Sequence, residues 1–283
     1  MLDDGWLYFG GVDIARGGMS GGDSLVSGHT GDDFAMATWR WRPDHPKAQL
    51  VSFFRQTGIE LPQMSAVAHR HEMKYGYTYI VADPGGGGIF LRDDLRKPIQ
   101  DDGSTTFAVQ PLISEGDERM AGLGKPIIVW FKRGEPKLEK AGMIYQSESH
   151  LPNVAHTLLR AGFQQKKIEL PQKWPHWGLH QNTDSQLRWL NEMAGLPPME
   201  RAQAEIDLAL AQLYSIERDT DKAGNPEQDR FGNFKFDSRR KKDSAYAMMY
   251  GYFGICLYET WLSQEKTRSS QIEAIFEFTK MTW

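Results

Sequence analysis

The stretch Trp6-Leu-Tyr-Phe-Gly-Gly-Val-Asp13-Ile-Ala15 decides the fold of this chain. It is rich in aromatic and branched apolar residues, so we predict a half-buried strand over residues 6–14. The run carries an acid, Asp13, near its end, and a glycine-rich segment follows. A carboxylate at the end of a buried strand is unfavourable unless a cation shares it. The usual cations are an Arg or Lys side chain or a metal ion.

Two more acids stand beside apolar runs. Tyr77-Thr-Tyr-Ile-Val-Ala82 is a second strand-like run that leads to Asp83, followed by Pro84 and four glycines. Asp243 stands just ahead of the apolar run from Ala245 to Tyr258. We predict that Asp13, Asp83 and Asp243 meet in one place and hold divalent metal.

Size and charge limit the protein class. With 283 residues the chain can form one large domain or two small ones and can bury a substantial core. The formal net charge of −4 argues against a strong stand-alone nucleic-acid binder, although a local basic face on an acidic body is compatible with it. No apolar stretch reaches the roughly 18 residues of a membrane span, so we expect no membrane contact.

The N-terminal residues and the cysteine content indicate the cellular compartment. The N-terminal residues Met1-Leu-Asp-Asp are acidic and do not form a signal-peptide pattern. The one cysteine, Cys256, excludes an intrachain disulfide. Both observations predict a reducing, cytoplasmic setting.

Hydrophobic periodicity predicts strands first and alternating helices and strands afterwards. After the first strand we expect a returning strand at 23–27, a hairpin at Thr30–Asp33 and a strand at 34–41. The remaining expected strands are at 50–54, 77–82, 105–111 and 126–131, with a hairpin at 230–236. The expected helices are at 61–76, within 85–96, and at 151–165, 185–194, 199–216, 243–263 and 269–280.

This order predicts an α/β fold, with a mixed β-sheet flanked by helices on both faces. The right-handed rule for crossovers places the strand 77–82 beside the strand 6–14, with their carboxyl ends at one edge. Ligands bind at that edge in such sheets. Asp13 and Asp83 are therefore expected to be neighbours.

Each acid also has a local explanation. Asp13 could pair with Arg16, Asp83 could bond its own backbone in a turn, and Asp243 could be a helix N-cap. Asp23 could be a hairpin residue. Their joint placement at strand and helix ends favours a shared site. Oxygen ligands without nearby Cys or clustered His suit Mg²⁺ or Mn²⁺ rather than zinc, and two such ions about 4 Å apart can cleave phosphodiesters.

Three segments resemble the nuclease domain of tailed-bacteriophage terminase large subunits. They are Gly11-Val-Asp13-Ile-Ala with Asp23-Ser ten residues on, Val81-Ala-Asp83-Pro-Gly-Gly-Gly-Gly with Leu91 and Leu95 behind it, and Lys242-Asp243-Ser-Ala-Tyr-Ala. Order and spacing over nearly the whole chain carry this resemblance. It implies the RNase H-like fold.

The resemblance implies a two-metal-ion endonuclease that cuts concatemeric double-stranded viral DNA during genome packaging. Asp13, Asp83 and Asp243 match the metal-binding and catalytic triad, and Asp23 matches an auxiliary metal-binding acid. Ser244 stands where the family often has a second acid, which puts the second metal position in question. The implied partners are double-stranded DNA, the terminase ATPase domain, the small terminase subunit and the portal.

The chain lacks the motif of a packaging ATPase. Its Gly124-Lys125 pair is followed by Pro126 rather than Ser or Thr, so it contains no P-loop. We therefore expect one piece of a larger motor protein. Within residues 1–283 we expect a single nuclease domain, with its core at about 5–131 and 226–265 and an elaboration at about 132–225.

Two charged segments have weaker functional interpretations. The run Arg239-Arg-Lys-Lys242 adjoins Asp243, and either phosphate binding or plain solvation explains it; we hypothesise that Arg239, Arg240, Lys241 and Lys242 bind DNA. Glu72, on the expected first helix, is a candidate metal ligand, although a packed helix face explains it better.

Two other functions remain open: an actin-like or sugar-kinase-type ATPase, and a non-catalytic DNA- or motor-docking module.

Overall fold

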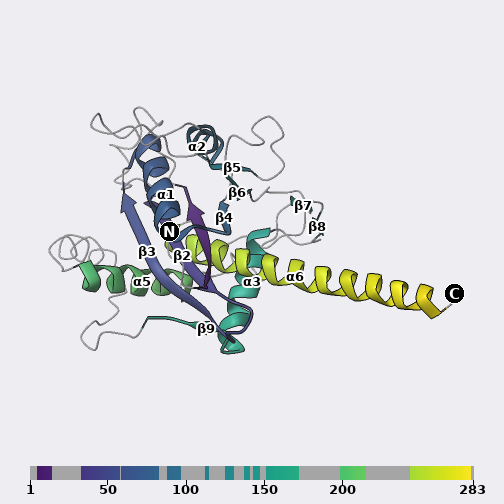
Figure 1. The fold of residues 1–283 in the computed structure, drawn as a ribbon. Helices are drawn as coiled ribbons and strands as arrows, with labels where there is room; N and C mark the ends of the chain where they lie inside the picture. Colours follow the sequence, from purple (N-terminus) through teal and green to yellow (C-terminus); the bar gives the residue numbers. More distant parts are fainter. Residues whose placement is uncertain are drawn as a thin grey trace, which may run out of the picture.

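The structure is a computed structural model, and its described residues form a mixed β-sheet with helices on both faces (Figure 1). Strand and helix bounds are given below as each element appears. The described residues are 5–14, 33–57, 59–82, 88–96, 112–114, 125–130, 137–140, 143–146, 151–171, 198–214 and 243–281.

The sheet begins as an antiparallel meander of β1 (Leu7–Asp13), β2 (Asp33–Trp41) and β3 (Ala48–Thr57). On the other side of β1 follow β4 (Tyr79–Ala82), β6 (Lys125–Trp130) and β5 (Leu112–Ser114), all parallel. The described strands thus lie in the order β5-β6-β4-β1-β2-β3-β9, where β9 is Ile168–Glu169. The predicted α/β fold class is confirmed, and β4 lies beside β1 as the crossover rule required.

Helix α1 (Leu61–Tyr75) makes the crossover that turns the chain back to β4. Pro62 stands in its first turn, where a missing N–H costs nothing, and the side chain of Gln63 accepts the Glu60 amide at 3.1 Å. The helix ends at Gly76, whose φ of 63° suits glycine, and the Gly76 amide donates to the Glu72 carbonyl at 2.8 Å.

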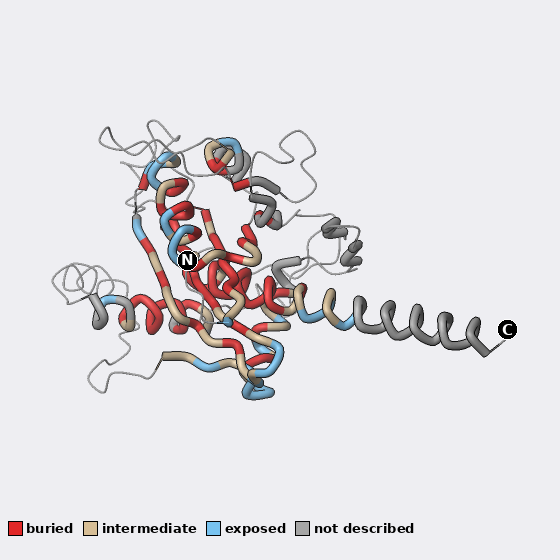
Figure 2. The backbone as a smooth tube through the Cα atoms, viewed as in Figure 1, coloured by how far each residue is buried: buried red, intermediate tan, exposed pale blue. Residues whose placement is uncertain are grey.

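Two apolar cores lie on opposite faces of the sheet, because side chains alternate along β1 and β2. Phe9, Ala37 and Trp39 face α6 (Asp243–Met281), α5 (Pro198–Tyr214) and α3 (Leu151–Gln164). Tyr8, Val12 and Met36 face α1 and α2 (Gly88–Leu95). Figure 2 shows that the start of α6 runs through the most buried part of the molecule.

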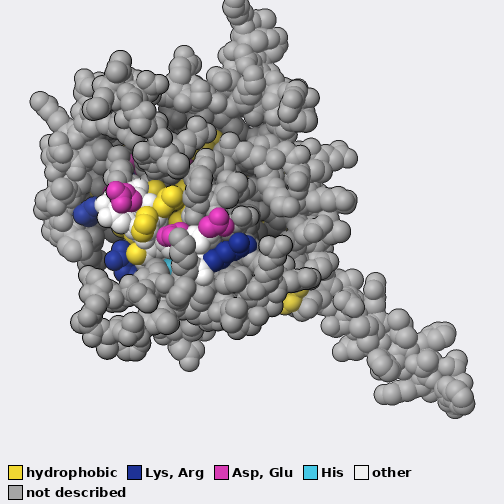
Figure 3. Space-filling view, turned by 90° about the horizontal axis from the view of Figure 1, so that it is seen from above, with side chains coloured by type: hydrophobic (Ala, Val, Ile, Leu, Met, Phe, Trp, Pro, Cys, Tyr) yellow, Lys and Arg dark blue, Asp and Glu magenta, His cyan; other side chains and the backbone are white. Residues whose placement is uncertain are grey.

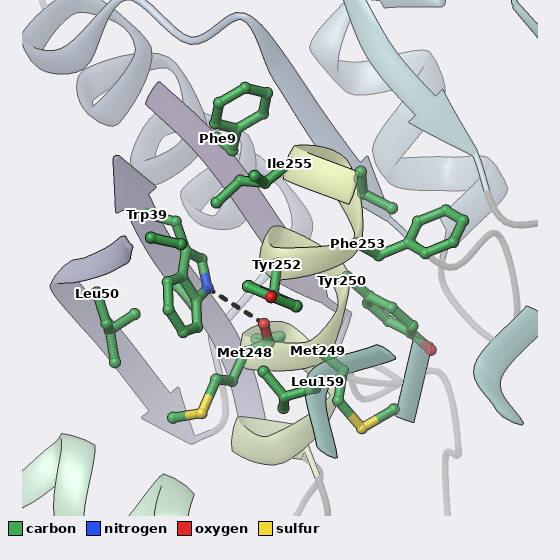
Figure 4. Close-up of a cluster of buried hydrophobic side chains, with 14 of the residues drawn as sticks. Phe9, Trp39, Leu50, Leu159, Met248, Met249, Tyr250, Tyr252, Phe253 and Ile255 are labelled. Carbon is green, nitrogen blue, oxygen red and sulfur yellow. Dashed lines mark hydrogen bonds between the residues drawn. The ribbon is translucent and has the colours of Figure 1, made fainter. Parts of the chain in front are cut away.

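Helix α6 crosses β1 at backbone distance, because glycines meet there. A Cβ placed on Gly11 would lie 2.0 Å from the Ala247 carbonyl oxygen and 2.2 Å from the Gly251 nitrogen. Beside this contact, Trp39 Nε1 donates to the Met248 carbonyl oxygen at 3.1 Å, drawn as the dashed line in Figure 4. The ring of Tyr252 packs against Trp39 with ring centroids 5.6 Å apart, and Phe253 is fully buried on another side of the helix.

Three details differ from the sequence expectations. The helices expected at 243–263 and 269–280 are one helix, α6, because the residues between them are helix formers with no Gly or Pro. Asp33, expected in a hairpin, is the first residue of β2, and β2 pairs directly with β1. A separate two-stranded sheet, absent from the expected elements, pairs β7 (Lys137–Lys140) with β8 (Met143–Gln146).

Several expected elements lie outside the described residues, namely the strands at 23–27 and 105–111, the helix at 185–194 and the hairpin at 230–236. Within the described part of the chain, no helix is long and apolar enough to cross a membrane.

The contact between β1 and α6 can be tested with two glycine substitutions. Gly11→Ala should lower the free energy of unfolding by about 3 kcal/mol or more, because its methyl group meets backbone atoms that cannot rotate away. Gly254→Ala is the control: its methyl group would meet the Val81 side chain at 3.2 Å, and alanine favours the helix. Denaturant unfolding should show a large decrease for the first variant and little or none for the second.

Candidate metal centre

Asp13 is the last residue of β1 and Asp243 is the first residue of α6. The strand and the helix run in opposite directions, so these two ends lie on the same side of the molecule. Along β1, Phe9 packs near Gly254 of α6, whereas Gly11 packs against Ala247 and Gly251. From Gly11 to Asp13 the strand advances about 6.6 Å, and from Ala247 back to Asp243 the helix covers about 6 Å. The two acids therefore reach the same level at the carboxyl end of β1.

The acids also share one face of the sheet. Asp13 pairs in register with Ala35, so Asp13, Ala35 and Asp33 have the same orientation by the alternation of side chains. Ala35 belongs to the core that packs on α6. Asp13 and Asp33 thus face the start of α6. Figure 3 views the molecule from above, the side toward which the arrow of β1 points in Figure 1, and shows acidic, basic and apolar described side chains close together on that face.

A hydrogen bond connects β2 to the first residue of α6. The Asp33 amide donates to Asp243 Oδ2 at 3.1 Å, across 210 residues of sequence. The Asp243 side chain is half-buried, and the bond fixes one of its oxygens toward the sheet edge. Asp243 therefore has a tertiary contact as well as its place at the helix start.

Behind this bond lies a buried ion-pair triad. Arg55 Nη1 donates to Asp33 Oδ2 at 2.6 Å and Arg55 Nε donates to Glu205 Oε2 at 2.9 Å, with all three side chains at most 6% exposed. Burial opposes the charge of Arg55, but the two carboxylates outweigh it and raise its pKa. Burial raises the pKa of Glu205, and Arg55 only partly offsets this. One guanidinium thus binds two buried carboxyl groups.

A side chain from α5 caps the start of α6. Gln212 Oε1 accepts the amides of Ser244 and Ala245, at 2.9 and 3.3 Å. First-turn amides have no partner within their own helix, so this side chain supplies one. Ser244 is fully enclosed, and its hydroxyl makes no hydrogen bond to the described part of the chain. Position 244 therefore faces the protein interior.

The other predicted site residues lie outside the described residues. These are Asp23, Asp83 and the basic run Arg239, Arg240, Lys241 and Lys242. The last described residue of β4, Ala82, pairs with Val12, and Asp83 follows it in the sequence. Among the described residues, no group of three His, Cys, Asp or Glu side chains could hold a metal ion.

Glu72 lies at the other end of β4. Its Oε2 accepts the Tyr77 amide at 2.8 Å, just before the strand begins, and the residue packs on the α1 side of the sheet. Burial lowers the pKa of neighbouring His71 to about 4, with Lys74 and Arg70 adding to the effect. Burial also lowers the pKa of His69. Because Glu72 lies beside the start of β4 and not at the carboxyl end of β1, the structure does not support it as a metal ligand of this centre.

Sequence reasoning missed Asp33, Arg55, Glu205 and Gln212. A usable signal was present in two of them: Asp33 lies at an even spacing from the core residues Ala35 and Trp39, and Arg55 lies two residues after the core residue Phe53. A charge at an inward position implies a partner. Which partner it has could not be read from residues separated by 22 and 150 positions.

The chain matches no protein-family model and no curated protein. Among solved structures it is similar to nuclease domains of phage large terminases. The domain from bacteriophage SPP1, with bound Mn, is 13% identical, with a TM-score of 0.41 over 87% of this chain and 85% of that one. The nuclease from thermophilic phage G20c, with bound magnesium, is 12% identical, with a TM-score of 0.44 over 89% and 82%.

The nuclease domain of the large terminase subunit of bacterial virus Sf6 is 11% identical, with a TM-score of 0.45 over 87% of both chains. At these identities the similarity concerns the arrangement of the backbone and assigns no role to any side chain.

Arg55 can be tested by removing its charge at similar volume. Arg55→Met should lower the free energy of unfolding by about 3–5 kcal/mol, because two buried carboxylates are left without their cation. Without Arg55, the pKa of Glu205 in the folded state rises further above its unfolded value. The folded state then binds more protons, so the destabilisation should be larger at pH 8 than at pH 5. Denaturant unfolding at both pH values measures it.

The control is Arg70→Met, the same change at an exposed position on α1. It should alter stability by no more than about 0.5 kcal/mol at either pH. Equal effects at positions 55 and 70 would contradict the structural role of the triad.

Proposed function

We propose that this chain is the nuclease domain of a phage terminase large subunit, a metal-dependent endonuclease that cuts double-stranded concatemeric DNA during genome packaging. The observation that supports it most is the hydrogen bond from the Asp33 amide to the Asp243 carboxylate, on the face of the sheet where Asp13 ends β1. These residues come from opposite ends of the sequence. The motif order around them resembles that family.

The donor set fits a hard divalent cation. Asp13 and Asp243 offer carboxylate oxygens, and no described Cys or His side chain lies on the elements that carry them near this edge. Mg²⁺ and Mn²⁺ favour such oxygen ligands. The Asp33 carboxylate is bound to Arg55, so it is a support for the site rather than a ligand.

We assign Asp83 as the third ligand. Val81, two residues earlier, packs in the core on the α6 side of the sheet. Because side chains alternate along a strand, a strand that continues to residue 83 carries this carboxylate on the side of Asp13. Asp23 is proposed as an auxiliary acid on the resemblance alone.

Bound metal would supply an activated water and charge stabilisation for phosphodiester hydrolysis. The role of the protein is to hold Asp13, Asp83 and Asp243 ionised and convergent, which three neighbouring carboxylates tolerate when a cation is bound. Two ions suit this chemistry. The enclosed Ser244 gives no ligand for the second ion, so that ion would depend on the three aspartates and on Asp23.

We propose double-stranded DNA as substrate, with the run from Arg239 to Lys242 in contact with phosphates. The terminase ATPase domain, the small terminase subunit and the portal are proposed partners, in the host cytoplasm. We also propose that residues 1–283 form one domain, since Ile206, Ala209 and Leu210 of α5 belong to the same core as β1 and α6.

The catalytic assignment is tested by plasmid digestion. The protein should degrade plasmid DNA with Mg²⁺ or Mn²⁺ and not with EDTA. Asp13→Asn, Asp83→Asn or Asp243→Asn should each slow degradation by about 100-fold or more, because each removes an anionic ligand. Asp44→Asn, an exposed residue paired with Arg42 in the turn between β2 and β3, should not change it. Circular dichroism checks that each variant is folded.

Two outcomes would contradict the proposal. One is full activity in the Asp13 and Asp243 variants. The other is steady ATP hydrolysis without DNA, which would indicate an ATPase on a related fold.

The proposed DNA-binding run is tested by replacing Arg239, Arg240, Lys241 and Lys242 with Ala. Binding to a DNA duplex in EDTA should weaken, and the slope of log K against log salt should fall by about 0.9 for each phosphate that the variant no longer neutralises. Arg70→Ala with Lys74→Ala, both exposed on α1, is the control and should leave the slope unchanged. An unchanged slope in the four-residue variant would contradict the proposal that these four residues bind DNA phosphates.

A further inference from the structure

Helix α5 buries three polar side chains: Asp207, which accepts from Gln203 of the same helix at 3.4 Å, and Glu205 and Gln212, which bind residues of other elements. Glu205 and Gln212 are both about 5% exposed and are seven residues apart, which places them on one face of the helix. Between them, Ile206, Ala209 and Leu210 pack in the core beneath α6. The apolar residues already hold α5 in place, and burying polar groups opposes folding unless they are bonded. Their presence therefore needs a separate explanation.

The two polar side chains reach Asp243 by different routes. Gln212 Oε1 accepts the amides of Ser244 and Ala245, which directly follow Asp243. Glu205 binds Arg55, Arg55 binds the Asp33 side chain, and the Asp33 amide binds the Asp243 carboxylate. One route fixes the backbone that carries Asp243, and the other fixes its carboxylate oxygen.

We infer that α5 is a positioning element that fixes the start of α6 and the direction of the Asp243 carboxylate, through Gln212 and the Glu205–Arg55–Asp33 relay. As a statement about metal ligation, this rests on the proposed function. It gives α5, which lies between β8 and α6 in the sequence, a role in the site. Residues that orient a metal ligand typically contribute 10–100-fold to metal affinity.

A positioning role and a packing role for Gln212 predict different experimental results. Gln212 contacts backbone amides at the helix start, so its removal exposes those amides without opening the apolar core around Ala209. A packing role would appear in global stability. A positioning role appears in local amide protection and in metal affinity, and the first of these needs no metal.

The experiment compares Gln212→Met with Gln203→Met, a half-buried glutamine on the same helix that contacts Asp207. In metal-free protein, amide hydrogen exchange at Ser244 and Ala245, followed by NMR, should become about tenfold faster in Gln212→Met and stay unchanged in Gln203→Met. Calorimetry should show Mn²⁺ binding weakened by about 10–100-fold in the first variant alone. Gln212→Glu keeps an acceptor oxygen and should restore the protection.

Gln212→Asn is the second variant, because its amide remains polar but is one methylene too short to reach both amides. Unchanged exchange at Ser244 and Ala245 in both Gln212→Met and Gln212→Asn would overturn the inference. Exchange that rises equally in Gln203→Met would do the same. If the unsubstituted protein binds no Mn²⁺, the proposed function fails, whereas the exchange data still decide whether α5 holds the start of α6.

Discussion

The backbone contact between β1 and α6 is the constraint on which the rest of the structure depends. Gly11 leaves room for the Ala247 carbonyl and the Gly251 amide, so helix and strand approach without side chains between them. This close approach sets the level of α6 against the sheet, with Trp39 bonded to the Met248 carbonyl alongside. Because the two elements run in opposite directions, the same contact brings Asp243 to the end of β1 where Asp13 lies.

A second layer of polar contacts holds that end together. The meander supplies Asp33 and Arg55, α5 supplies Glu205 and Gln212, and all four side chains are buried. Buried ions and amides contribute little to net stability, but they have few alternative arrangements that satisfy them. Their effect is to specify where α6 begins. The centre therefore combines a steric contact, which sets its position, with hydrogen bonds, which set its direction.

Much of the fold could be predicted from local patterns. The aromatic run before Asp13, the helix after Leu61 and the strand before Asp83 were each visible in periodicity, and the crossover rule then placed β4 beside β1. The prediction fails where a local signal points away from the tertiary structure. Acids are common in hairpins, which favours a turn at Asp33, and the polar segment within α6 favours two helices instead of one.

The sequence by itself determined the order of the elements, the alternation that gives β1 and β2 two apolar faces, and the acids that stand at element ends. These depend on residues close together in the chain. Only the tertiary structure decided that Asp33 binds Arg55, that Arg55 also binds Glu205, and that Gln212 caps α6. Such pairs are 22 to 150 residues apart, and their partners are chosen by which side chains the packed sheet and helices bring within hydrogen-bond distance.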